Sequence, residues 1–231
     1  MWLLAVDSSS KDASVALLRD DRLVALVAPR SDEQHSVALF HHIQAALREA
    51  GIELKDIDAY AVASGPGAFT GLRIGLALVK ALAEMHARPV VPVGVLEAVC
   101  ASANAEGCLI PVVNAYRGQV FAAVYEKRDA EPALQGRERV FTLPEFLQQL
   151  EADSVRPESC TFVSPNLDRW AEPLAASAFG ASRRESISPV LAEAVAQRAR
   201  RKLSRGEAVD ALHLQANYVR RSDAELLWKP K

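Results

Sequence analysis

Two polar side chains, each at the end of an apolar run, are the candidates for metal chemistry. Asp7 ends the first apolar run of the chain, and Asn114 ends a similar run that follows Gly107. Proteins that transfer phosphoryl groups use carboxylates at such positions to hold magnesium beside the phosphates. An asparagine cannot supply the second negative charge, so the pair indicates a degenerate site. We weigh two roles for Asp7, capping of the turn Ser8–Ser10 and residual metal binding.

A glycine-rich segment, Gly65–Gly75, follows a strand-like run and opens an apolar helix. Glycines in this position let a phosphate or another backbone come close. A P-loop would also need a lysine directly after its last glycine, but the first lysine downstream is Lys80. A dinucleotide fingerprint would need glycine where Thr70 stands. The segment therefore looks like a nucleotide loop whose chemistry is incomplete.

The helix that follows the loop is nearly uncharged. Between Gly71 and Ala83 its only charges are Arg73 and Lys80, and Gly71 and Gly75 share one face. Each glycine costs up to about 1 kcal/mol of helix stability relative to alanine. Close packing must offset that cost. The helix is therefore either buried in its own fold or packed on the helix of a second subunit, and the sequence leaves both open.

Histidine and serine give no pattern typical of an enzyme. His35, His41 and His42 share one predicted helix, without the spacing and third ligand of a zinc site. We expect exposed or interface histidines. Ser64 lacks the Gly-x-Ser-x-Gly frame of serine hydrolases. The sequence therefore predicts no catalytic residue and no metal site.

Basic residues gather on a helix predicted near the end of the chain. Clustered cations form either a solvated helix face or a contact with a nucleic-acid backbone, since phosphate contact requires only cations at close spacing. The cluster consists of Arg198, Arg200, Arg201, Lys202 and Arg205, with Arg220 and Arg221 further on.

Composition limits the class of protein. The 231 residues are 50% hydrophobic and carry a net charge of −2, so there is no global electrostatic case for nucleic-acid binding. Three cysteines without metal spacing indicate free thiols of a reducing compartment. The apolar start is too short for a signal peptide, and no apolar run reaches membrane-spanning length. We expect a soluble, cytoplasmic protein without a membrane contact.

The predicted elements form two successive β-β-β-α-β-α units. This order indicates a duplicated α/β fold with a cleft between its halves, hinged near 104–108. The first subdomain is 1–106, the second is 107–210, and 211–231 is predicted to pack back on the first, while 165–185 has no clear assignment. Strands are predicted at 2–7, 13–19, 22–28, 58–64, 90–95, 108–114, 119–126, 137–142 and 160–164, and helices at 35–50, 70–86, from 95 to about 104, 143–151 and 189–204.

Four motifs in this order resemble the TsaB (YeaZ) family, a bacterial subunit needed to make threonylcarbamoyladenosine beside the tRNA anticodon. They are Asp7-Ser-Ser-Ser with Ser14-Val-Ala-Leu, the helix led by His35, the segment Gly65–Arg73, and Asn114–Phe121. The resemblance covers residues 1 to about 125. It implies the duplicated fold of actin, the sugar kinases and the heat-shock ATPases, a ribonuclease H-like architecture.

The resemblance also implies a non-catalytic scaffold without a cofactor of its own. Such a subunit forms homodimers, and a heterodimer with the related subunit TsaD, through its first two helices; the ATPase TsaE joins a larger complex. Contact with tRNA occurs only through the complex, and a nucleotide at the partner interface is compatible with this reading. The implied interface is His35, Leu39, His42, Gly67, Phe69, Gly71, Arg73, Gly75, Leu78, Val79 and Leu82, and the implied degenerate nucleotide cleft is Asp7, Ser8, Ser9, Asn114 and Arg117.

One segment departs from the family's usual Asp-Ala-Arg-x-Gly-Glu-Val-Tyr. Asn114, Tyr116, Gln119 and Phe121 replace its acid, first arginine, glutamate and tyrosine. The rival hypothesis is a self-sufficient ATPase or kinase of the same fold, or a peptidase like the M22 glycoproteases. The shortage of acids in the predicted cleft favours the scaffold.

Overall fold

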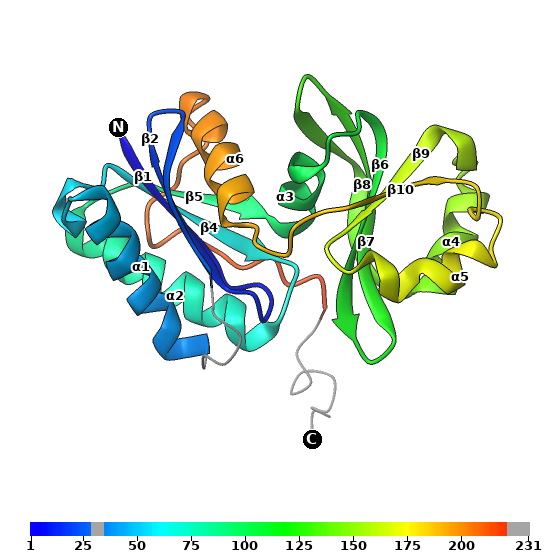
Figure 1. Ribbon diagram of the computed structural model, residues 1–231, viewed down its shortest axis with the longest axis horizontal. Coiled ribbons are helices and arrows are strands. Elements are labelled where there is room, and N and C mark those ends of the chain that lie inside the picture. Colours follow the sequence, from blue (N-terminus) through cyan, green and yellow to red (C-terminus); the bar gives the residue numbers. More distant parts are fainter. Residues whose placement is uncertain (29–34, 221–231) are drawn as a thin grey trace.

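The computed structural model describes residues 1–28 and 35–220, with side chains from Leu39 onward in the first helix. Two five-stranded sheets stand side by side, each with helices packed on it (Figure 1). None of the helices among the described residues is long and apolar enough to cross a membrane.

The first sheet has the strand order β3-β2-β1-β4-β5. β1 pairs antiparallel with β2 and parallel with β4, and β4 pairs parallel with β5. Two helices, α1 and α2, lie next to each other on one face of this sheet (Figure 1). The bounds are β1 Trp2–Asp7, β2 Ser14–Arg19, β3 Arg22–Val27, α1 His35–Ala50, β4 Ala59–Gly65, α2 Phe69–His86 and β5 Val90–Gly94.

The second sheet repeats this pattern in the order β10-β9-β6-β7-β8. β6 pairs antiparallel with β7 and parallel with β9, as β1 does with β2 and β4. The shared topology confirms the predicted duplicated fold. The bounds are β6 Gly107–Tyr116, β7 Gln119–Arg128, β8 Glu131–Thr142, α4 Leu143–Ala152, β9 Cys160–Ser164, α5 Ala171–Ala175 and β10 Arg183–Ser186.

The last helix of each unit packs on the sheet of the other unit. α3 (Val95–Ser102) follows the first sheet but lies on β6, β7 and β8, whereas α6 (Ala192–Ser204) follows the second sheet but lies on β1, β2, β4 and β5 (Figure 1). The two helices also contact each other. One hydrophobic cluster consequently runs from Leu3 and Ala5 of the first sheet to Phe121 and Val163 of the second.

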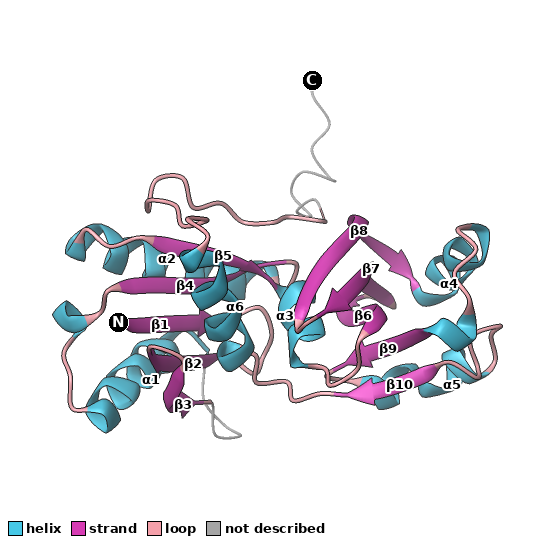
Figure 2. Cartoon of the chain, turned by 90° about the horizontal axis from the view of Figure 1, so that it is seen from above, coloured by secondary structure: helices cyan, strands magenta, loops and turns pink. Residues whose placement is uncertain are grey.

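The segment after α6 contacts both units. We call residues 209–220 the C-terminal strap. Val209 pairs with Val90 beside the edge strand β5, and the Asn217 amide nitrogen donates to the Ser64 carbonyl at 2.7 Å. The strap then reaches the second unit, where Arg220 Nη1 donates to the Ala115 carbonyl at 3.1 Å. Figure 2 shows this connection running along the β5 side of the first sheet.

Three elements differ from the sequence prediction. β8 begins at Glu131 rather than 137, although its first half is mostly exposed and lacks an apolar pattern. The unassigned stretch 165–185 contains a short 3-10 turn, α5 and the edge strand β10. α6 begins at Ala192, after Pro189.

The glycine face of α2 packs on its own chain. A side chain at Gly75 would overlap the Ser8 side chain, and one at Gly71 would overlap the Ser8 carbonyl oxygen. The Ser8 hydroxyl donates to the Gly71 carbonyl at 2.8 Å, and the Ala68 amide donates to the Ser9 carbonyl at 2.7 Å. Of the two roles left open for these glycines, the structure supports packing within the chain.

We therefore expect Gly75→Ala to lower the free energy of unfolding by about 1–3 kcal/mol, as overpacking of a tight core does. Combining it with Ser8→Ala, which removes the obstructing hydroxyl, should recover part of the loss. Gly94→Ala is the matched control, because a Cβ there meets neighbours no closer than 3.5 Å. Denaturant titrations of the four proteins measure the differences, and a Gly75→Ala variant as stable as Gly94→Ala would contradict this packing.

Candidate functional site

Asp7 lies at the carboxyl end of β1 and is fully buried. Its Oδ1 accepts a hydrogen bond from the Ser9 amide at 2.9 Å, which closes a turn over Ser8. Burial raises the pKa of Asp7, and the hydrogen bonds from Ser9 only partly oppose it. The bond from the Ser9 amide is what the first of the two roles considered for Asp7, capping of its own turn, requires. Its other oxygen, Oδ2, is buried without a hydrogen-bond partner among the described residues, and residual metal binding stays untested.

Asn114 occupies the equivalent position in the second unit, near the end of β6. Its Oδ1 accepts from the Tyr116 amide at 3.0 Å, the same two-residue reach that Asp7 uses. The duplicated turns have thus kept their hydrogen bond, while the second turn has no carboxylate. Of Asp7 and Asn114, only Asp7 can ionise, and its side chain is buried.

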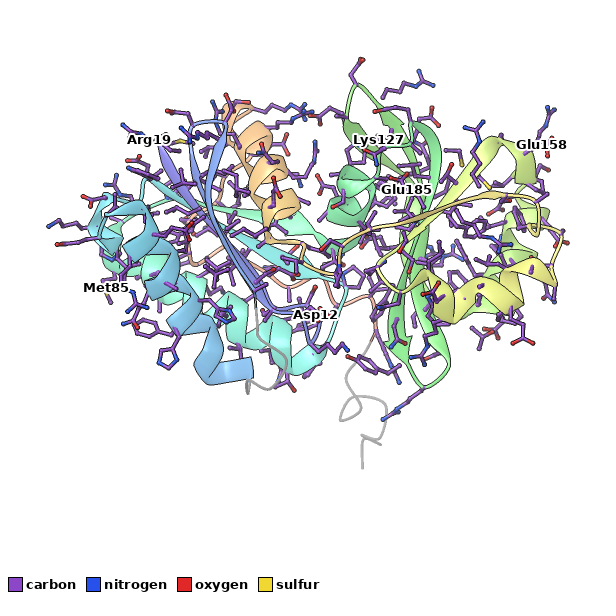
Figure 3. The ribbon with its side chains drawn as sticks, viewed as in Figure 1. Asp12, Arg19, Met85, Lys127, Glu158 and Glu185 are labelled. Carbon is purple, nitrogen blue, oxygen red and sulfur yellow. The ribbon has the colours of Figure 1, made fainter. Side chains whose placement is uncertain are left out.

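A cleft of about 500 Å³ lies between these two turns. Ser9 and Asn114 line it, as predicted, but Asp7 and Ser8 are buried and do not. Its charged lining residues are Lys11, Asp12 and Arg169, which come from the β1–β2 turn and the segment after β9. Figure 3 labels Asp12 where that turn faces the second unit. Among the described residues, no three His, Cys, Asp or Glu side chains gather as a metal site.

Arg117, which the sequence assigned to this cleft, lies elsewhere. It lines a second pocket of about 510 Å³ between the glycine loop, the β6–β7 turn and the C-terminal strap. Arg73 lies there with its guanidinium carbon 3.8 Å from the centre of the Phe69 ring, and its Nε donates to the Tyr218 hydroxyl at 3.2 Å. The Phe69 and Tyr218 rings are 5.1 Å apart. Arginine and aromatic side chains are prominent in its lining, and none of the described lining residues is a carboxylate.

The residues predicted for a partner interface separate into two groups. Leu39, His42, Gly75, Val79 and Leu82 are buried in the folded chain, because α1 and α2 use this side to pack on the first sheet. Their assignment to a partner interface stays a prediction. Arg73 is exposed and Phe69 and Leu78 are half-buried, whereas the His35 side chain lies outside the described residues.

The outward face of α2 carries different residues from those predicted. Thr70, Arg73, Ala77 and Ala81 are exposed at helical spacing. Two large apolar side chains of the same pair of helices are also exposed, Phe40 on α1 at 44% and Met85 on α2 at 72%. Figure 3 labels Met85. The small residues that remain accessible are thus alanines, while Gly67 and Gly71 face Ser8 and Ser9.

The basic cluster of α6 is neutralised within the chain. Arg198 is buried and pairs with Glu97 and Glu131, and Arg201 and Arg205 also pair with Glu131. Arg201 and Arg205 nevertheless stay exposed, and a contact of this cluster with tRNA stays a prediction. Sequence patterns do not reveal the acids, because Glu131 lies 67 residues before Arg198 and Glu97 lies 105 residues before Lys202.

The resemblance noted in the sequence can now be tested against known proteins. A family model described as "TsaD: tRNA N6-adenosine threonylcarbamoyltransferase" matches residues 27–207. The tRNA threonylcarbamoyladenosine biosynthesis protein TsaB of Escherichia coli K12 is 32% identical over 165 residues, which cover 67% of this chain and 70% of that protein. The chain belongs to the TsaB family.

Further comparisons support the assignment of the chain to the TsaB family. The TsaB protein of Bacillus subtilis 168 is 33% identical over 130 residues, and the match spans 56% of this chain and 57% of that relative. The structure of YeaZ from Pseudomonas aeruginosa has a TM-score of 0.75 at 25% identity and covers 94% of this chain and 99% of that one. A hexokinase from Thermus thermophilus, with a TM-score of 0.51 at 13% identity, shares the fold alone.

The cleft leads to a prediction about catalysis. The isolated protein should not hydrolyse ATP measurably with magnesium present, because Asn114 cannot replace a second metal-binding acid. Phosphate release over hours at micromolar protein is the measurement. Turnover of about 1 per second, the lower end for kinases, that disappears in Asp7→Asn would contradict this interpretation of the cleft.

The α6 ion pairs lead to a prediction about pH. Burial alone would raise the pKa of Glu131, but hydrogen bonds from Arg201 and Arg198 outweigh it and lower the pKa from 4.5 to about 2. The contribution of ionised Glu131 to the free energy of unfolding is therefore complete above about pH 4.5 and is lost as pH falls toward 2.

Denaturant unfolding between pH 5 and 3 tests this. The free energy of unfolding of the wild type should fall more steeply than that of Glu131→Gln, whose side chain does not titrate. Equal slopes would mean that the ion pairs do not stabilise the folded state.

Proposed function

We propose that the chain is a non-catalytic scaffold that binds a TsaD partner and supports threonylcarbamoyl transfer to the adenosine beside the tRNA anticodon. The observation that carries the proposal is the cleft, where Asp7 is buried in its own turn and its counterpart is the amide Asn114. A protein with this fold and without the acids for metal binding can still contribute a surface. Its TsaB relatives are named for the same biosynthesis.

The surface we assign to TsaD is the outward face of α1 and α2. Phe40 on α1 and Met85 on α2 are exposed large apolar side chains, and α2 also exposes Ala77 and Ala81. Exposed apolar side chains beside small residues suit a helix that packs closely against another helix. The buried glycines act indirectly, because they hold α2 tightly on the β1–β2 turn.

The same face would serve a homodimer. If both assemblies use it, a second copy of the chain and TsaD cannot be bound at once, so the two dimers compete. Formation of the working complex then requires the homodimer to dissociate. In this proposal TsaE joins the TsaD heterodimer, tRNA is contacted through the complex, and the site of action is the cytoplasm.

The rival functions find less support. A kinase or ATPase would need two metal-binding acids at the positions of Asp7 and Asn114, where this chain has one buried acid and an amide. The likeness to a hexokinase extends to the fold alone. A serine peptidase would need an accessible nucleophile with a base. Ser64, the serine closest to the glycine loop, is buried and donates its hydroxyl proton to the Val93 carbonyl at 3.1 Å.

Substitution of an exposed alanine tests the proposed surface. Ala77→Arg places a long charged side chain where a close helix contact is expected, and it should weaken binding to TsaD about 100-fold, or about 3 kcal/mol. The reconstituted transfer, with TsaD, TsaE, threonylcarbamoyl-adenylate and tRNA, should fall with it.

The matched control is Ala152→Arg, the same change at an exposed position of α4 in the second unit. It should leave binding and transfer unchanged. Ala77→Arg protein that is folded, by its unfolding midpoint, and binds TsaD as tightly as Ala152→Arg would exclude this face as the interface.

A further inference from the structure

A buried arginine joins three elements at the junction of the two units. Arg198 belongs to α6, which lies on the first sheet, and its side chain is 5% exposed. Its Nη1 donates to Glu131 Oε2 of β8 at 2.6 Å. Its Nε and Nη2 donate to Glu97 Oε1 of α3 at 3.0 and 2.9 Å. One guanidinium is therefore bonded across the junction in two directions.

Three more cations of α6 reinforce the same two acids. Arg201 Nη1 is 2.8 Å from Glu131 Oε1, and Arg205 Nη2 is 3.1 Å from Glu131 Oε2. Lys202 Nζ is 2.8 Å from Glu97 Oε2. The cations come from a helix on the first sheet, whereas Glu131 belongs to the second sheet and α3 packs on the second sheet. Each of these bonds thus crosses from one packing layer to the other.

The C-terminal strap makes a separate contact with β8. Asn217 is anchored to the first sheet by its backbone bond to Ser64, and its Nδ2 donates to Glu138 Oε2 at 2.6 Å. Glu138 Oε1 accepts from the Tyr125 hydroxyl at 2.7 Å, so both carboxylate oxygens have partners. These residues and Arg198 line one pocket of about 570 Å³ between the units.

We propose that these contacts form an internal latch, consisting of Arg198, Glu97, Glu131, Asn217 and Glu138, that holds the two units in one closed arrangement without a ligand. Proteins of hinged two-domain design close around what they bind, since the ligand contacts both domains. Here charge-assisted bonds span the junction from within the chain. Opening the junction would take the buried guanidinium of Arg198 away from its carboxylate partners, and an unpaired buried charge is costly. The proposal is independent of which partner the chain binds.

The distance between two labels, one in each unit, shows whether the latch keeps the units closed. Nitroxide labels are attached through unnatural keto side chains at Lys55 and Glu158, which are exposed in opposite units, so the native cysteines are not involved. Double electron–electron resonance on the full chain should give a single narrow distance peak that magnesium and ATP do not shift. A broad distribution that narrows with ATP would overturn the proposal.

Variants test the two contacts. Glu131→Gln should broaden the distribution toward longer distances, and adding Asn217→Ala should broaden it further. Glu126→Gln is the matched control, because Glu126 pairs with Arg128 within β7 alone, and it should keep the narrow peak. If Glu131→Gln does not fold, Asn217→Ala alone carries the test, since Asn217 is an exposed strap residue. A narrow, unshifted peak in every folded latch variant would overturn the proposal.

Discussion

The exchange of α3 and α6 between the two sheets is the constraint on which the rest of the structure depends. Each helix buries its apolar side on the sheet of the other unit, as Val195 and Ala199 do from α6 and Leu96 and Val99 do from α3. The units therefore share one core, and the inner face of each sheet is covered only when both units are folded. The turns that carry Asp7 and Asn114 are fixed relative to each other for the same reason.

The residues that resemble a nucleotide site make contacts within the chain. The glycines that could admit a phosphate admit the Ser8–Ser9 turn instead. The acid that could hold magnesium accepts a hydrogen bond from the Ser9 amide. The first unit also leaves the outward side of α1 and α2 accessible, and our proposal assigns its contribution to function to that surface.

Sequence patterns predicted the duplicated fold because apolar strands and amphipathic helices have strong local periods. They missed β10, a four-residue edge strand of Arg183–Ser186 with two arginines and a glutamate, because its pairing with β9 depends on tertiary contacts. The sequence could not show which side of α2 is buried, because small residues lie on both sides. Gly75 is buried, whereas Ala77 is exposed. Likewise Glu97 and Glu131 lie far from α6 in the sequence, so only the fold brings them to Arg198.

In our proposal this chain supports the transfer reaction through its surface and not through its cleft. Threonylcarbamoyladenosine formation in the reconstituted system tests this when the cleft carries Lys11→Ala, Asp12→Ala and Arg169→Ala together. These are the charged residues that line the cleft, and all three are at least partly exposed. We expect the wild-type rate of transfer. Loss of transfer by a folded triple variant that still binds TsaD would contradict it.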